Sequence, residues 1–317
     1  MLFLGAGTHY PPSPPESALY EYKEEDRPPL GTALSKALVK ECLNDLDEES
    51  RRAVPDDAGL AEAEKQRRIF KRAEEEEQRG KKRAYLEKHI ENLQRTSWYY
   101  EVYKSRSSLI DKVTAAVDKE KQPSPVVRAL AEIDFPIVVT TNYDRLFENA
   151  LGRVAKTVSP IIYSPETQEV EELMGLPEKN ERWLFKIHGC ASKPDSIVIT
   201  DEDYIRFVLR MNDGDRHHPI PMKIRTQLKE WPTLFIGYSL LDYNLRLLFQ
   251  ALRWRLKPVF WQPTYSLDYS PDLLIAATYG VPVAQGARQP FVRFIVEDIW
   301  KFVPQFYQEF FGRKMPP

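Results

Sequence analysis

An asparagine and an aspartate stand where a strand-like run gives way to a helix-like one. Residues 137–141 are largely β-branched, the composition of a buried parallel strand. Residues 145–151 follow with apolar side chains at helical spacing. Asn142 and Asp144 therefore fall at the carboxyl end of a strand, the edge at which open α/β sheets bind ligands. Asn142 has a second interpretation as a helix N-cap, and this segment alone leaves both open.

A histidine occupies the same kind of position further along the chain. Residues 183–187 form an apolar, strand-like run that ends at His188 and Gly189. Histidine is the side chain whose ordinary pKa lies nearest neutral pH, so it can exchange a proton there. An isolated histidine is most often structural. One at the carboxyl end of a strand is a better candidate for a general base.

Two further apolar runs, at residues 2–4 and 233–236, end in small or polar residues. The residues at their carboxyl ends are Gly5, Ala6, Gly7, Gly237, Ser239 and Asp242. Glycine lets backbone N–H groups approach a phosphate closely, and hydroxyl or carboxylate side chains can hold a ribose. Together, the four strand ends predict one composite pocket.

The other apolar runs alternate between strand-like and helix-like segments. This alternation predicts an α/β fold, a Rossmann-like doubly wound parallel sheet with a helical insertion or subdomain. Further strands are expected at residues 157–163, 196–199, 259–261 and 291–296. Helices are expected at residues 31–48, 125–132, 201–211, 223–230, 244–253 and 299–311.

Residues 49–121 form a long, charge-rich tract of helical composition with few apolar residues. Charge runs of this kind usually make solvated helix faces, and an exposed helical pair is also a surface for a partner or for self-association. We expect this tract to be a charged helical insertion. The whole chain, residues 1–317, is then one domain, which strands and a helix within residues 258–317 complete.

Residues 11–29 are rich in proline, so they are expected to form a loop rather than a regular element. A loop next to a phosphate-binding turn is a candidate lid. A surface loop without a function is the other interpretation, and the sequence does not decide between them.

The composition excludes several classes of protein. The net charge is −2 over 317 residues, so no overall positive field draws the chain to nucleic acid or to a membrane surface. No apolar run approaches the ~20 residues that span a bilayer, and no secretory signal pattern opens the chain. Two cysteines are too few for a four-thiolate zinc site, and His217 and His218 are expected in a surface loop. A reduced, cytoplasmic setting is expected.

Taken in order, these segments resemble a known family. The motifs are GAG at 5–7, TTNYD at 140–144, KIHG at 186–189, DY at 203–204 and FIGYSLLD at 235–242. Together they resemble the motif set of sirtuin-like domains, most closely the prokaryotic branch that acts as NAD hydrolases in antiphage defence. The resemblance covers residues 1–9 and about 125–260.

The resemblance implies a role for each matching residue. The catalytic pair would be Asn142 and His188, and Asp144 would contact the nucleotide or orient Asn142. The residues that would hold the dinucleotide are Gly5, Ala6, Gly7, Thr141, Asp144, Gly237, Ser239 and Asp242. Two positions depart from the family pattern, because His9 and Cys190 each stand where serine is usual.

The implied activity is hydrolysis of NAD⁺ to ADP-ribose and nicotinamide, with NAD as substrate and no metal. Such an enzyme would deplete NAD in abortive infection. The four cysteines of the zinc ribbon in deacylating sirtuins are missing, which argues against deacylation. We expect control by homo-oligomerisation or by a separate protein such as a DNA-translocase-like ATPase. Alternatives are a non-catalytic NAD or ADP-ribose sensor, a deacylase or an ADP-ribosyltransferase.

Overall fold

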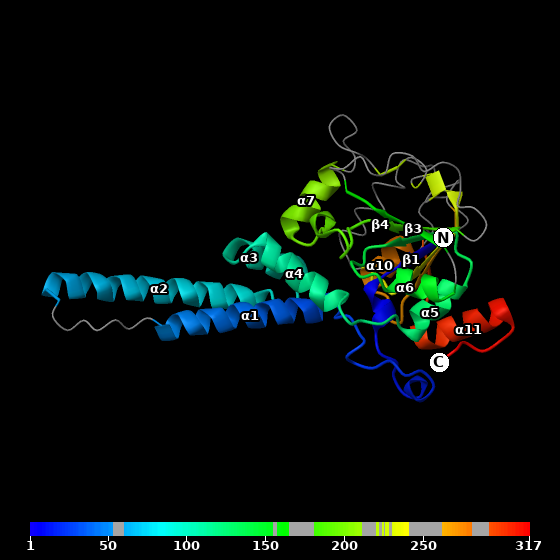
Figure 1. Ribbon diagram of the computed structural model, residues 1–317, viewed down its shortest axis with the longest axis horizontal. Helices are drawn as coiled ribbons and strands as arrows, with labels where there is room; N and C mark the ends of the chain where they lie inside the picture. Colours follow the sequence, from blue (N-terminus) through cyan, green and yellow to red (C-terminus); the bar gives the residue numbers. More distant parts are fainter. Residues whose placement is uncertain are drawn as a thin grey trace. The chain divides into compact units, whose positions relative to one another are not determined.

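The computed structural model describes most of the chain in two compact units (Figure 1). The described residues are 1–52, 60–154, 157–164, 181–210, 220–221, 224, 226–227, 230–240, 262–280 and 292–317. The first unit contains Met1–Leu30, Ile110–Val198 and Glu202–Pro317, and the second contains Gly31–Leu109 and Ile199–Asp201.

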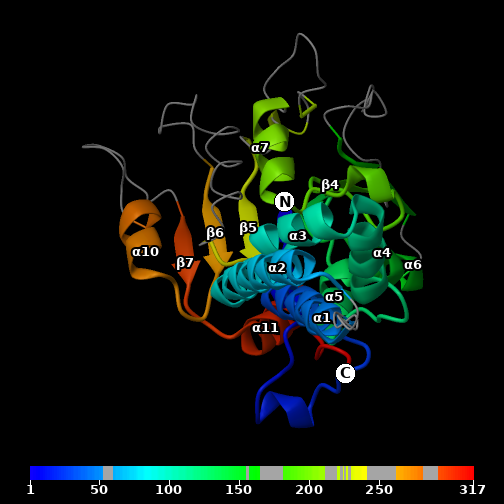
Figure 2. The same ribbon diagram turned by 90° about the vertical axis from the view of Figure 1, so that its left-hand side faces the viewer.

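The first unit is built on a parallel sheet. Within the described residues its strands are β1 (Leu2–Leu4), β2 (Ile137–Thr140), β3 (Thr157–Ile162), β4 (Glu181–Lys186), β5 (Thr233–Ile236), β6 (Thr264–Leu267) and β7 (Arg293–Ile295). They lie in the order β3-β4-β2-β1-β5-β6-β7, and every neighbouring pair is parallel. Figure 2 shows β5, β6 and β7 side by side. The predicted Rossmann-like doubly wound sheet is confirmed.

Helices cover both faces of this sheet. Successive strand residues point to opposite faces, so each strand contributes side chains to two cores. Leu2 and Leu4 face one core, together with α5 (Pro125–Glu132), α6 (Leu146–Arg153) and α11 (Ile299–Phe311). Figure 1 shows α5, α6 and α11 along the same side of the sheet. Phe3 faces the other core. Its helical contributors include α7 (Asp201–Arg210) and α10 (Leu273–Tyr279).

The second unit is helical. It contains α1 (Gly31–Arg52), α2 (Glu62–Lys88) and α3 (Leu93–Tyr103), and α4 (Arg106–Val117) continues into the first unit. The apolar face of α1 is buried, and it includes Leu34, Leu38 and Cys42. In α2, only Leu86 is buried, which agrees with the solvated faces expected of a charged tract.

Two of the predicted strands need comment. Residues 196–199 were expected to form a strand, but a short 3-10 helix at Pro194–Ser196 replaces its start, and this prediction is wrong. The N–H groups of Ser196 and Ile197 donate to carbonyls within the preceding turn, and the N–H of Val198 donates to the carbonyl of His188 at 3.1 Å. The strand expected at 259–261 lies outside the described residues, while β6 was not predicted.

Other expectations lie wholly or mainly outside the described residues. These are the helices at 223–230 and 244–253, the histidines His217 and His218, and Asp242. No helix in the described part of the chain has the length and apolar character to cross a membrane.

Candidate functional site

The sheet reverses its strand order at β1. β2 lies on one side of β1 and β5 lies on the other, so the connections from β1 to β2 and from β4 to β5 run in opposite directions across the sheet. In open α/β sheets the crevice beyond the carboxyl ends of the strands at such a point is the usual ligand site. The strands that end in the predicted site residues, β4, β2, β1 and β5, are contiguous.

The glycine turn after β1 contacts the turn after β5 through backbone atoms. The N–H groups of Gly5 and Gly7 donate to the carbonyls of Ile236 and Gly237, each at 2.9 Å. A Cβ on Gly5 would lie 2.4 Å from the carbonyl oxygen of Gly237, and Gly237 itself has φ +76°. Glycine is therefore required for the approach of the two turns, whereas Ala6 between them is exposed.

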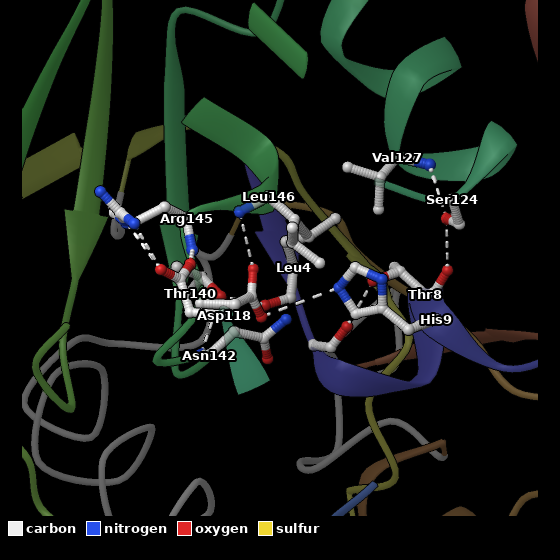
Figure 3. Close-up of polar contacts among 12 residues, drawn as sticks. Leu4, Thr8, His9, Asp118, Ser124, Val127, Thr140, Asn142, Arg145 and Leu146 are labelled. Atoms are coloured by element: carbon white, nitrogen blue, oxygen red, sulfur yellow. Dashed lines mark hydrogen bonds and ion pairs between the residues drawn. The ribbon is translucent and has the colours of Figure 1, made fainter. Parts of the chain in front are cut away.

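The start of helix α5 holds the glycine turn in place. Ser124 is the N-cap of α5, and its hydroxyl accepts from the N–H of Val127 at 3.1 Å. The same hydroxyl donates to the carbonyl of Thr8 at 2.7 Å, while the Thr8 hydroxyl donates to the carbonyl of Gly5 at 2.7 Å. Figure 3 shows Ser124, Thr8 and Val127 in this arrangement.

Threonines at the end of β2 brace the next turn. The Thr140 hydroxyl donates to the carbonyl of Leu4 at 2.7 Å and accepts from the N–H of Asn142 at 3.0 Å (Figure 3). The N–H and hydroxyl of Thr141 both lie 2.9 Å from the Tyr238 hydroxyl on the turn after β5. Thr141 therefore contacts the neighbouring turn with its own polar groups.

Asn142 does not cap helix α6. The first N–H of that helix, on Leu146, donates to Asp144 Oδ1 at 3.0 Å instead. Among the described residues, the Asn142 amide has no hydrogen-bond partner, although the residue is only 9% exposed. A nearly buried amide of this kind has its donor and acceptor available to a bound molecule.

A buried lysine fixes the backbone of the same turn. Lys186, at the end of β4, donates to the carbonyl of Asp144 and to Glu148 Oε1, the latter at 2.9 Å. Burial by itself lowers the pKa of Lys186, but Glu148 and Asp144 outweigh it and hold the pKa above its ordinary value. The ammonium therefore remains charged and anchors the turn between β2 and α6.

His188 is buried at the carboxyl end of β4. Its ring makes edge-to-face contacts with Tyr204 and Phe207, at centroid distances of 5.0 and 5.4 Å. Burial lowers the pKa of His188 to about 3. The ring is therefore neutral at neutral pH, and its unprotonated nitrogen can accept a hydrogen bond.

The sheet register relates His188 to Asn142. Thr140 pairs with Lys186 in the parallel ladder of β2 and β4, so Asn142 and His188 each stand two residues beyond a paired position. The turns that carry them also touch, because the N–H of Ala191 donates to the carbonyl of Tyr143 at 2.7 Å. The two predicted catalytic residues thus emerge from neighbouring strands at one sheet edge.

Of the remaining predicted site residues, the structure describes one and not the other. Ser239 is exposed beyond β5, and Asp242 lies outside the described residues. Sequence reasoning had assigned no role to Thr140, Lys186 or Tyr238. Their contacts join segments far apart in the chain, so no local pattern signals them.

A family model described as SIR2-like domain matches residues 136–281. These residues are similar to SIR2-like domains. This finding confirms the resemblance drawn from the ordered motifs, and the SIR2-like region begins just before β2 and extends past β5. It therefore includes the turns that carry Asn142, His188 and Gly237.

Several curated proteins are similar to parts of the chain. Defense-associated sirtuin 2 of Bacillus subtilis is 26% identical over 157 residues, which is 48% of this chain and 14% of the relative. NAD(+) hydrolase ThsA of Acinetobacter baumannii is 25% identical over 171 residues, 53% of this chain and 32% of the relative. NAD(+) hydrolase ThsA of Bacillus cereus is 28% identical over 126 residues, which is 40% of this chain and 24% of the relative. The matches span less than half the length of these relatives.

Proposed function

We propose that this protein hydrolyses NAD⁺ at the bond between nicotinamide and ribose, releasing nicotinamide and ADP-ribose. The observation that carries the proposal is the register of β2 and β4, which puts Asn142 and His188 in equivalent positions beside the switch point of the sheet. A SIR2-like match over the same segment supports a nucleotide as the ligand.

The residue chemistry fits this reaction. The nicotinamide ring of NAD⁺ is cationic, so it leaves as a neutral molecule when the C1′–N bond breaks and it takes the bonding electrons. Water adds to C1′ and loses a proton. Neutral His188 would accept a hydrogen bond from that water or from a ribose hydroxyl, and such acid–base assistance is worth about 10²–10⁴-fold in rate. The Asn142 amide would orient the same oxygen.

The names of the relatives support a role in defence. Two are called NAD(+) hydrolase and one is called a defence-associated sirtuin. On this basis the activity would deplete NAD during infection by a phage. An enzyme of that kind must be silent in an uninfected cell, so we propose that assembly with further copies, or with a separate regulatory protein, switches it on.

The direct test is nicotinamide release from NAD⁺ by the wild type, Asn142→Ala and His188→Gln. Both variants are expected to lose at least about 10²-fold in kcat. Asn149→Ala is the matched control, because Asn149 is exposed on α6. Far-ultraviolet circular dichroism and unfolding midpoints check that each variant folds. Wild-type rates in a folded Asn142→Ala or His188→Gln would refute these roles.

One observation favours a second candidate, a sensor that binds NAD or ADP-ribose without cleaving it. A histidine whose pKa is lowered to about 3 has little affinity for a proton. Isothermal titration beside the release assay separates the two functions. Binding of NAD⁺ without nicotinamide release, under conditions that allow assembly, would support the sensor.

A further inference from the structure

A second histidine, His9, ends the glycine turn with polar groups at both ring nitrogens. Nδ1 lies 3.3 Å from the hydroxyl of Tyr22, and Nε2 lies 3.8 Å from Oδ2 of Asp144. The Tyr22 hydroxyl also donates to the carbonyl oxygen of Gln122 at 3.0 Å. A polar row therefore runs from the carbonyl of Gln122, an exposed residue, through buried Tyr22 and His9 to Asp144, and Figure 3 shows His9 beside the labelled residues of the turn.

The charge of Asp144 selects the tautomer of His9. Burial lowers the pKa of His9 and the Asp144 carboxylate offsets this only in part, so the ring is neutral at neutral pH. A neutral imidazole carries one N–H. If that proton sits on Nε2, the N–H faces the carboxylate. If it sits on Nδ1, a lone pair faces the carboxylate instead, which is unfavourable. Nδ1 is then an acceptor facing the Tyr22 hydroxyl, which shares its single proton between Nδ1 and the carbonyl of Gln122.

This row is poorly suited to stabilising the fold. A separation of 3.8 Å is too long for a hydrogen bond, so the buried ring and carboxylate are incompletely compensated. Replacing both members of such a buried polar pair by apolar side chains is often neutral or stabilising, whereas removing one member destabilises. Asp144 Oδ1 accepts a hydrogen bond from the N–H of Leu146. Oδ2 is the carboxylate oxygen that faces His9, so His9 influences how the carboxylate is oriented.

We propose that His9 is a positioning residue of the site, which orients the Asp144 carboxylate and the turn carrying Asn142, while Tyr22 fixes the His9 ring. The effect of His9 on catalysis rests on the proposed NAD⁺ hydrolysis, whereas the contact between His9 and Asp144 does not. Because Tyr22 belongs to the proline-rich segment, that segment contributes to the site through this hydroxyl.

The kinetic test compares His9→Leu, His9→Gln and Tyr22→Phe with the wild type. His9→Leu is expected to lose about tenfold in kcat/KM, and its unfolding midpoint should fall because Asp144 Oδ2 is left buried without its partner, so activity is compared at a temperature at which every variant is folded. His9→Gln should recover part of this loss, because the glutamine amide can occupy the place of Nε2–H. Tyr22→Phe should lose about fivefold. Tyr20→Phe, a hydroxyl removed from the same segment beside Trp300, is the matched control and should lose nothing.

Two kinetic outcomes would overturn the inference. One is a wild-type kcat/KM in a folded His9→Leu protein. The other is a loss of kcat/KM in both His9→Leu and His9→Gln that follows an equal loss of stability, which would make His9 merely structural.

A spectroscopic test remains decisive if the wild type hydrolyses no NAD⁺. With ¹⁵N-labelled histidine, the ring nitrogen resonances of His9 are expected to shift in Asp144→Asn and in Tyr22→Phe, and to stay unchanged in Tyr20→Phe. Unchanged His9 resonances in Asp144→Asn would refute the coupling of ring and carboxylate. An inactive wild type with the expected shifts would refute only the hydrolase proposal.

Discussion

Gly5, Gly7 and Gly237 lack side chains at a point where the backbones of two turns touch. A Cβ on Gly7 would lie 2.8 Å from the carbonyl oxygen of Gly237, much as one on Gly5 would. Their motif resembles a phosphate-binding turn, yet backbone contact alone already demands glycine here. The N–H groups of Gly5 and Gly7 are themselves used in this contact, because they donate to the carbonyls of Ile236 and Gly237.

Gly5→Ala is expected to lower the free energy of unfolding by about 1–3 kcal/mol, because the added methyl group would collide with the Gly237 carbonyl. Gly152→Ala is the control within the same unit. Its added Cβ would meet nothing within 4 Å, and alanine is favoured over glycine in a helix, so a gain of up to about 1 kcal/mol is expected. Urea unfolding of both variants measures this, and equal midpoints would contradict the contact.

His188 makes a separate prediction about stability and pH. Its pKa is about 3 in the folded protein and 6.5 ordinarily, so between these values the unfolded chain binds a proton that the folded protein does not. Stability should therefore fall as the pH is lowered from about 6.5, by up to about 1.4 kcal/mol per pH unit from this residue. His188→Gln should flatten the dependence, measured by urea unfolding at several pH values. An unaltered slope would show that His188 is not the cause.

At the scale of elements, the strand–turn–helix unit of β2 and α6 is held from a neighbouring strand. Lys186 on β4 reaches the Asp144 carbonyl and Glu148 on α6. Thr140 ties the end of β2 to β1 through the carbonyl of Leu4. The turn that carries Asn142 is therefore set by its neighbours in the sheet rather than by a helix cap.

Lys186→Met is expected to cost about 3–5 kcal/mol, because it leaves the Glu148 carboxylate buried without its partner. The double variant with Glu148→Leu should recover most of this stability. Nicotinamide release should stay reduced in the double variant, since the Asp144 carbonyl has still lost its donor. Chemical unfolding and the release assay together measure both effects.

The control for this pair is Lys81→Met. Lys81 pairs with Glu77 at 2.7 Å on the exposed surface of α2, so its loss should leave the unfolding midpoint almost unchanged. Full activity of a folded double variant would show that the Lys186 contact with Asp144 has no functional role.

At the scale of the molecule, the chain combines an α/β unit with a charge-rich helical one. We propose that the helical unit is an insertion in a single sirtuin-like domain. Its helix α2 exposes Phe70 and Ile69, at 74% and 54%, which are unusual on a face otherwise rich in charge. This surface is a candidate for contact with another copy or a regulatory partner.

Regulation by self-assembly predicts that activity depends on protein concentration. Size-exclusion chromatography with light scattering, combined with nicotinamide release at each concentration, is expected to show little activity in the monomer and more in larger species. Phe70→Ser should weaken assembly without changing the fold of the α/β unit. A fully active monomer would exclude this form of control.

Local composition was sufficient to predict much of the fold. The strands β1 and β5 and the helices α5 and α11 have the predicted bounds. These segments carry strong local signals, such as an apolar run before glycine, or Ser124 and Pro125 at a helix start. The strand expected at 196–199 is wrong because the N–H groups of these residues bond within the preceding turn and to the carbonyl of His188. β6 was missed because it depends on pairing with β5.

The sequence by itself determined the order of the motifs, and with it the α/β class, the SIR2-like resemblance and the identity of Asn142 and His188 as candidates. The tertiary structure decided how these residues are held. The contacts of His9 with Asp144 and Tyr22, and of Lys186 with the turn before α6, join groups that no local pattern relates. Such contacts depend on strand order and register, which follow from the packing of the whole sheet.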